Sequence, residues 1–234
     1  MATIARRIDK KSTQRLLKAA VHIGALTPLV LMIWDYYQGT LGPDPIRELT
    51  LRTGKTAIVL LFLSLAITPA HIWFGWKQIV PLRRLLGLYA VFYVALHLTI
   101  FLWLDYLLDP RLIVEALFAK RYALVGLAAF AILLPLAITS NRLSMRKLGK
   151  KWKSLHKWVY MAGLLAVLHY FLLVKNAYTE PLIFAVVLAL LLLTRVKPVK
   201  LTILQWRRTI ENRLMRRSLP AKQATSTAAP LRKQ

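Results

Sequence analysis

Six apolar stretches run along the chain, and each is long enough, or nearly so, to cross a lipid bilayer as a helix of about 20 residues. Hydrophobic residues make up 57% of the sequence, more than a soluble domain of this size needs. The pattern predicts an all-α membrane protein, a bundle of six transmembrane helices. The predicted spans are Ala19–Tyr37, Ala57–Trp76, Leu85–Leu104, Tyr122–Ile138, Leu155–Val174 and Pro181–Val196.

The net charge of +25 is distributed unevenly over this topology. Most Lys and Arg residues fall in the N-terminus, the second-to-third loop, the fourth-to-fifth loop and the C-terminal tail, which share one side of the membrane. The other side carries equal numbers of basic and acidic residues. The positive-inside rule therefore predicts a multi-pass protein with both termini in the cytoplasm. No basic segment carries a nucleic-acid-binding fold, so anionic lipid is the expected partner of the basic face and nucleic acid is not.

Three regions follow from this pattern. Residues 1–18 form a basic cytoplasmic N-terminus, residues 19–196 the six-helix membrane domain, and residues 197–234 a basic cytoplasmic tail. Apolar residues in the tail recur near helical spacing among arginines, which predicts a helix on the lipid surface, with a solvated basic tail as the alternative. From Pro220 onward we expect disorder. On the opposite side we expect loops over residues 39–55, 105–121 and 176–180.

Two of the five histidines lie deep in apolar spans at matching depth. His97 follows the basic residue Arg84 by 13 residues, along a span that runs outward. His169 follows Lys157 by 12 residues, along another outward span. At about 1.5 Å per residue both imidazoles lie roughly 18–20 Å from the basic edge, past the middle of a hydrocarbon core about 30 Å thick. An imidazole in hydrocarbon is costly unless something binds it.

Such a pair is what a haem iron with two axial imidazoles requires, one from each of two helices. For a single histidine, a hydrogen bond to a neighbouring helix would be the simpler interpretation. The chain has no cysteine, and no Asp or Glu lies at this depth to complete a zinc or copper shell. The sequence therefore predicts a haem held by His97 and His169. The alternative is a non-redox transport or scaffold protein whose histidines serve protons or packing.

His156 lies nearer the basic edge. It precedes His169 by 13 residues, about 20 Å along a helix, and an ideal helix would point the two side chains some 140° apart. The matching depth in the third span holds Arg84 rather than histidine. Three interpretations of an inner site at His156 stay open: a second haem with an unusual ligand, a flavin or quinone site, and a histidine at the lipid headgroups.

The two remaining histidines also lie in the inner half. His22, early in the first span, is either a packing residue or a participant in the inner site. His71 lies beside Trp73 and Trp76 near the cytoplasmic end of the second span, so we expect it in an interfacial aromatic belt.

Four segments resemble the MsrQ family, formerly called YedZ, and the resemblance runs from about Val21 to Val196. They are "LLGLYAVFYVALHL", "ITSNRLSMRKLGKKWKSLHKWVYMAGLLAVLHYFLLVK", "LGPDPIRELTLRTGKTA" and "HIGALTPL". The resemblance implies a six-helix, ferric-reductase-like membrane domain. It aligns His97, His156 and His169 with the family's haem-associated histidines. The third span lacks the second histidine that ferric reductases and NADPH oxidases carry there.

The resemblance implies an electron-transfer subunit of an oxidoreductase in the bacterial inner membrane. The family is described with b-type haem and FMN, and we expect one or two haem b groups here. Family members draw electrons from the quinone pool or a flavin reductase. They pass them to MsrP, a periplasmic molybdopterin enzyme that reduces methionine sulfoxide in oxidised periplasmic proteins. The stretch after Val196 is shorter than a flavin or NAD domain, which needs on the order of 100 residues, so we expect electrons to arrive from quinol or a separate protein.

Overall fold

The computed structural model describes the backbone of residues 2–218 and the side chains of residues 12–210. Every regular element within residues 2–218 is helical, which confirms the all-α prediction for that part of the chain. The disorder predicted from Pro220 onward lies outside the described residues. The α-helices are α1 (Ala2–Tyr37), α2 (Pro45–Phe74), α3 (Leu82–Thr99), α4 (Pro110–Ala119), α5 (Arg121–Ile138), α6 (Arg142–Leu148), α7 (Lys150–Leu155), α8 (Val159–Leu173), α9 (Thr179–Leu193) and α10 (Lys197–Ser218).

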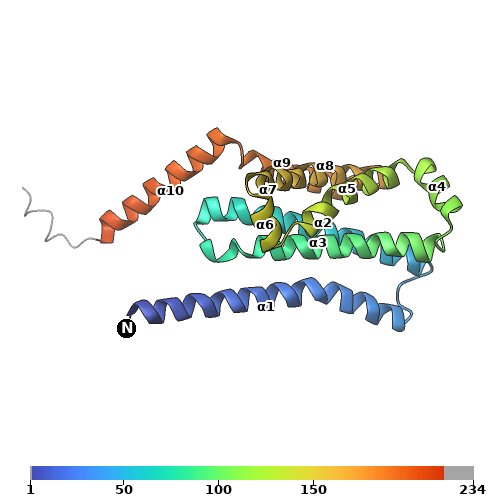
Figure 1. The fold of residues 1–234 in the computed structure, drawn as a ribbon, viewed down its shortest axis with the longest axis horizontal. Coiled ribbons are helices and arrows are strands. Elements are labelled where there is room, and N and C mark those ends of the chain that lie inside the picture. The colour runs from blue at the N-terminus through green and yellow to red at the C-terminus, as the bar shows by residue number, and fades with distance from the viewer. Residues whose placement is uncertain (1, 219–234) are drawn as a thin grey trace, which may run out of the picture.

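Three shorter helices interrupt the series: the 3₁₀ turns η1 (Lys77–Ile79) and η3 (His156–Trp158) and the π-helix η2 (Ile100–Asp105). Helix α2 packs along α3, α5 packs along α8, and α9 packs on α8, while α1 runs along the outside of the bundle (Figure 1). The start of α1, the α2–α3 turn, α6, α7 and α10 gather at one end, here called the α6 end. Helix α4 and the loop after α1 lie at the opposite end, here called the α4 end.

Helix α2 begins well before the predicted second span. Asp44 caps its N-terminus by accepting a hydrogen bond from the backbone N–H of Arg47 at 3.1 Å, and Pro45 occupies the first turn, where a missing N–H costs nothing. The helix ends at Gly75, whose left-handed conformation (φ 72°) lets its N–H bond the His71 carbonyl. The expectation of a loop over residues 39–55 was therefore wrong beyond Asp44.

The other two predicted outer loops also contain helix. Residues 105–121 include the ten residues of α4, and α9 already begins at Thr179. After Val196 the predicted helix is present as α10, whose axis bends by 74° from that of α9. Its position on a lipid surface stays a prediction.

Helix α1 is largely exposed and is attached to α3 by two tyrosines. The Tyr93 hydroxyl donates to the Ala25 carbonyl at 2.6 Å and accepts from the Leu29 N–H at 3.1 Å. The Tyr93 hydroxyl therefore lies between the Ala25 carbonyl and the Leu29 N–H of α1, next to Pro28, which has no N–H of its own. Tyr93 itself is fully buried, so this bond anchors α1 to the core. One turn earlier on α3, the Tyr89 hydroxyl lies 2.7 Å from Nδ1 of His22.

Four helical segments are long and apolar enough to cross a membrane, or five if the bent pair α9–α10 forms one span. The predicted fifth span is divided between η3 and the 15-residue α8. A multi-pass membrane protein is thus supported, whereas six spans and cytoplasmic termini stay predictions. The four segments are Ser12–Tyr37, Pro45–Phe74, Lys77–Asp105 and Arg121–Ile138.

Candidate metal centre

The structure places His97 of α3 and His169 of α8 side by side. Their ring centroids are 6.1 Å apart and the ring planes are almost perpendicular, at 88°. Both histidines are half-buried. Each histidine lies near the C-terminal end of its helix, towards the α4 end of the bundle. We call His97 and His169 the outer histidine pair.

Both rings are oriented by a backbone carbonyl. Nδ1 of His97 lies 2.8 Å from the Thr50 carbonyl of α2, and Nδ1 of His169 lies 2.6 Å from the Tyr122 carbonyl of α5. A carbonyl oxygen can only accept, so Nδ1 must carry the proton in each ring. Nε2 then keeps its lone pair. This is the arrangement that metal-binding histidines adopt, with the second nitrogen donating to a fixed acceptor.

Two glycines make room for the two rings. A Cβ added to Gly54 would lie 3.2 Å from Nδ1 and Cε1 of His97, and a Cβ added to Gly126 would lie 2.7 Å from Nδ1 of His169. Real Cβ atoms essentially never approach to the second distance. Each glycine follows by four residues the residue whose carbonyl accepts the Nδ1 proton. One turn of α2 therefore contacts the His97 ring in the same way as one turn of α5 contacts the His169 ring, through a carbonyl and a glycine.

The separation of the rings fits one metal ion between them. A metal–imidazole bond is about 2.0–2.1 Å, and the nitrogen lies roughly 1 Å from the ring centroid, so opposed imidazoles on one ion have centroids about 6 Å apart. Among the described residues, no group of three or more His, Asp or Glu could hold a metal. The protein thus offers an ion two ligands. The donor set fits haem, whose porphyrin supplies the remaining bonds to iron.

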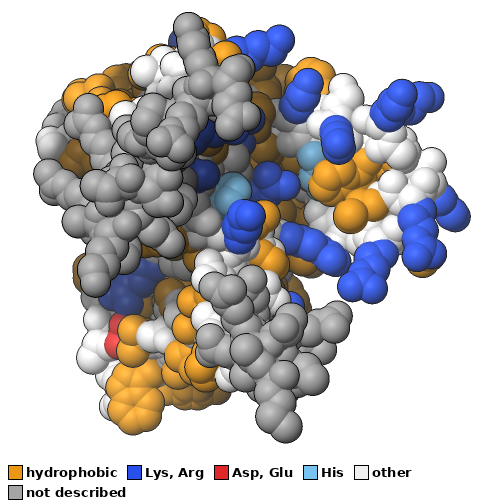
Figure 2. All heavy atoms as spheres, turned by 90° about the vertical axis from the view of Figure 1, so that its left-hand side faces the viewer, with side chains coloured by type: hydrophobic (Ala, Val, Ile, Leu, Met, Phe, Trp, Pro, Cys, Tyr) orange, Lys and Arg blue, Asp and Glu red, His pale blue; other side chains and the backbone are white. Residues whose placement is uncertain are grey.

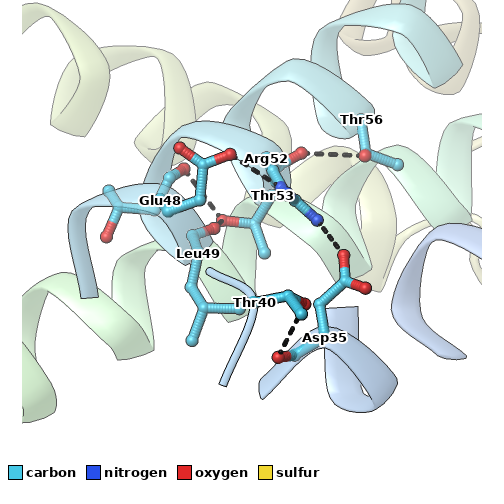
Figure 3. Close-up of polar contacts among 8 residues, drawn as sticks. Asp35, Thr40, Glu48, Leu49, Arg52, Thr53 and Thr56 are labelled. Carbon is cyan, nitrogen blue, oxygen red and sulfur yellow. Dashed lines mark hydrogen bonds and ion pairs between the residues drawn. The ribbon is translucent and has the colours of Figure 1, made fainter. Parts of the chain in front are cut away.

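Ion pairs join the helices around the α4 end of this site. Arg52 of α2 pairs with Asp35 of α1 and, at 2.8 Å, with Glu48 one turn earlier in its own helix (Figure 3). Lys55 bonds both carboxylate oxygens of Glu180 at 2.8 and 3.0 Å, which ties α2 to the start of α9. These contacts fix the turn of α2 that carries the Thr50 carbonyl and Gly54.

Thr53 belongs to the same turn of α2. Its side chain is almost fully buried, and its hydroxyl bonds the Leu49 carbonyl at 2.8 Å (Figure 3). The same hydroxyl lies 3.5 Å from Nδ1 of His97, a long contact beside the shorter bond to the Thr50 carbonyl.

His156 is placed apart from the outer histidine pair. It begins η3, its ring stacks on Trp152 at 4.0 Å, and its Nε2 lies 3.2 Å from the Thr139 hydroxyl. Trp152 also donates to the Thr139 carbonyl at 3.0 Å, so these three side chains form one cluster at the α6 end. Because a 3₁₀ turn separates His156 from α8, the 140° expected from an ideal helix does not apply directly.

The structure places the other two histidines in separate surroundings. His22 is engaged with Tyr89, as described above. Nδ1 of His71 is buried without a hydrogen-bond partner among the described residues, a feature that the expected interfacial position does not explain.

Sequence reasoning missed the carbonyl partners and the role of Gly54 and Gly126 against the rings. One signal was present in the sequence. Thr50 precedes His97 by 47 residues, and Tyr122 precedes His169 by the same 47. A search for equal spacings ahead of the two histidines would have found both glycines.

Comparison with known proteins identifies similar chains over the same region. Residues 53–167 match the family model described as ferric reductase like transmembrane component, a range that includes His97 and His156 and ends just before His169. A protein of Rhodospirillum rubrum is 43% identical over 189 residues, covering 80% of this chain and 91% of the relative. One of Xanthomonas campestris pv. campestris is 45% identical over 185 residues, covering 76% and 85%.

A third relative, from Xanthomonas axonopodis pv. citri, is 43% identical over 185 residues with the same coverage of 76% and 85%. All three relatives carry the name protein-methionine-sulfoxide reductase heme-binding subunit MsrQ. No solved structure matches the chain.

Proposed function

This chain belongs to the MsrQ family of haem-binding subunits, and on that premise we propose that it carries electrons through a haem b held between His97 and His169. The observation that supports the proposal most strongly is the outer histidine pair itself. Its rings are 6.1 Å apart, and each Nδ1 is tied to a backbone carbonyl. Bound there, haem would supply a one-electron carrier inside the membrane.

The surrounding residues hold the two imidazoles ready for an iron ion. The Thr50 and Tyr122 carbonyls accept the Nδ1 protons, which fixes the tautomer, orients the ring and raises the basicity of Nε2. Gly54 and Gly126 let α2 and α5 approach the rings closely. The apolar helices exclude water, which favours electron transfer over side reactions at the metal.

In this proposal the electrons travel from the α6 end to the α4 end. The α6 end carries most of the positive charge and faces the cytoplasm by the positive-inside rule. The outer histidine pair lies towards the α4 end, so outward delivery is the shorter route. The donor is quinol or a flavin reductase, and the acceptor is the periplasmic molybdopterin enzyme MsrP. FMN binding and the number of haems stay predictions from the family resemblance.

The experiment that tests this function uses sealed liposomes with the haem-loaded protein inserted in one orientation. The haem is reduced chemically, and MsrP with a methionine-sulfoxide peptide is then added on one side only. We expect rapid and complete reoxidation of the haem when the enzyme and the peptide are on the α4 side, and no reoxidation when the enzyme is omitted. Without the peptide, reoxidation should stop once the molybdenum centre has taken up the electrons that it can hold. Equal reoxidation from the α6 side would contradict both the topology and the electron path.

A further inference from the structure

The α6 end contains an arginine that reaches back between helices. Arg195, just after α9, donates from one terminal nitrogen to the Tyr160 hydroxyl at 2.5 Å and from the other to the Leu65 carbonyl at 2.7 Å. Its guanidinium also lies over the Tyr160 ring, 4.8 Å from the centroid. Its Nε is buried and has no hydrogen-bond partner among the described residues. A half-buried guanidinium is thus fixed in place by both terminal nitrogens, while its Nε–H has no partner among the described residues.

No carboxylate compensates this charge in the part of the chain whose side chains are described. The three ion pairs found there join Arg52 and Lys55 to acids at the α4 end. At the α6 end the neighbouring charge is positive. The Arg83 carbonyl of α3 accepts a hydrogen bond from the Ser64 hydroxyl at 2.7 Å. Ser64 directly precedes Leu65, whose carbonyl Arg195 bonds, so both arginines meet the same turn of α2. Like charges that are partly removed from water repel each other strongly. Because the Arg195 guanidinium is half-buried, an anion between the two arginines would reduce this repulsion.

Arg83 is accessible to such an anion. Its side chain is exposed, and the hydrogen bond that its guanidinium makes to the Thr68 hydroxyl is long at 3.4 Å. Figure 2 views the molecule from the α6 end and shows Lys and Arg side chains around a recess that contains histidine. Few acidic side chains are visible on that face. The fork of a guanidinium matches the oxygens of a phosphate, which it binds through two parallel hydrogen bonds.

We infer that Arg195 and Arg83 form a binding site for a phosphate group between α3, α8 and α9. The site lies where α3 begins and α9 ends, the level at which basic pockets between membrane helices bind anionic headgroups. The phosphate belongs either to a phospholipid or to a soluble compound, and both sources present the same oxygens to the arginines. The inference does not depend on the proposed electron transfer.

The test compares the haem-loaded protein with Arg195→Gln and Arg83→Gln variants, and with Arg146→Gln as a matched control. Arg146 is an exposed arginine of α6, so its loss changes the net charge at the same end equally. Thermal unfolding is followed in phosphatidylcholine nanodiscs with and without phosphatidylglycerol, and in detergent with and without inorganic phosphate. Native mass spectrometry counts the phospholipids that remain bound.

We expect the wild type and Arg146→Gln to be stabilised by the phosphate source and to retain a bound anion. Arg195→Gln should bind that anion at least about tenfold more weakly, because it loses a charge-assisted contact. Stabilisation by phosphatidylglycerol alone assigns the site to a lipid headgroup. Stabilisation by inorganic phosphate as well assigns it to a soluble compound. Both outcomes support the site.

Equal responses in the wild type and Arg195→Gln would overturn the inference, as would the absence of any response in the wild type. Loss of the haem absorbance from Arg195→Gln would assign the arginine to the cofactor and would also overturn it. If Arg195→Gln fails to fold, Arg83→Gln and Arg195→Lys decide the question. Lysine keeps the charge but not the fork, so it should bind phosphate more weakly than the wild type does.

Discussion

The bundle contains two helix pairs, α2–α3 and α5–α8. They place the same kinds of residues at the α4 end and different ones at the α6 end. At the α4 end each pair supplies a histidine whose Nδ1 bonds a carbonyl 47 residues earlier, next to a glycine one turn further along. At the α6 end the match is lost. The residue 13 positions before His169 is His156, whereas the residue 13 positions before His97 is Arg84.

This difference indicates that the two ends have different ligand chemistry. In the outer histidine pair each helix pair supplies one histidine in a similar setting, as a metal with two axial imidazoles requires. The α6 end has one histidine, bonded to Thr139 and stacked on Trp152, beside positive charge from Arg83. Any cofactor there needs a different second ligand. The comparison therefore predicts that substitutions at the α4 end have large effects on haem binding and those at the α6 end smaller ones.

Removal of either outer histidine should have the largest effect. We expect His97→Ala and His169→Ala each to lose most of the low-spin b-type spectrum, because each deletes one of two axial bonds. Haem content per protein and the visible spectrum of the purified variants measure this. If both variants kept a six-coordinate spectrum, the pairing of these histidines would be wrong.

Adding a methyl group at the two glycines should weaken haem binding to different extents in the two helix pairs. Gly126→Ala places a Cβ 2.7 Å from Nδ1 of His169 and should displace the ring, whereas Gly54→Ala places one 3.2 Å from His97 and should be tolerated better. Gly24→Ala is the control, since nothing lies within 4 Å of its Cβ. Haem retention should fall in the order Gly24→Ala, Gly54→Ala, Gly126→Ala, and the reverse order would refute this account of the glycines.

Replacement of His156 tests the other end. We expect His156→Ala to keep the spectrum of the outer haem but to slow its reduction by quinol or flavin, because His156 lies at the α6 end. Stopped-flow reduction of the haem measures the rate. Loss of the outer haem in this variant would show that His156, rather than one of the outer pair, ligates it.

The smallest effect is expected at Thr53. The corresponding position before Gly126 is Val125, so Thr53→Val makes the two helix pairs more alike. It removes the long 3.5 Å contact with Nδ1 of His97 but leaves the 2.8 Å bond to the Thr50 carbonyl. Unfolding free energy should change by less than about 1 kcal/mol. A shift in haem midpoint potential as large as that in Gly126→Ala would show that Thr53 has a larger role.

The outer histidine pair could be predicted from the sequence because depth in a span follows from residue number and helix rise. His97 and His169 lie beyond basic edges at almost equal distances, and that alone indicates one level in the bundle. The carbonyl partners could not be found from residue types, because every residue has a carbonyl. Only the equal 47-residue spacing marks Thr50 and Tyr122.

The start of α2 was missed for a different reason. The sequence pattern assigns the charged residues Glu48 and Arg52 to a loop, yet they lie within a helix, where Glu48 pairs with Arg52 and Arg52 also pairs with Asp35. The 3₁₀ turn at His156 depends on local hydrogen bonding that residue spacing does not reveal. Periodicity predicts that a helix exists more reliably than it predicts where the helix begins or is interrupted.

The central claim is that one haem is held between His97 and His169 with their ring planes nearly perpendicular. The most direct test is the electron paramagnetic resonance spectrum of the oxidised, haem-loaded His156→Ala variant, in which the outer site alone contributes. The 88° between the rings predicts a highly anisotropic low-spin ferric signal, since perpendicular imidazole planes leave the iron d orbitals nearly degenerate. A high-spin signal, or the rhombic low-spin signal of parallel imidazole planes, would contradict the account.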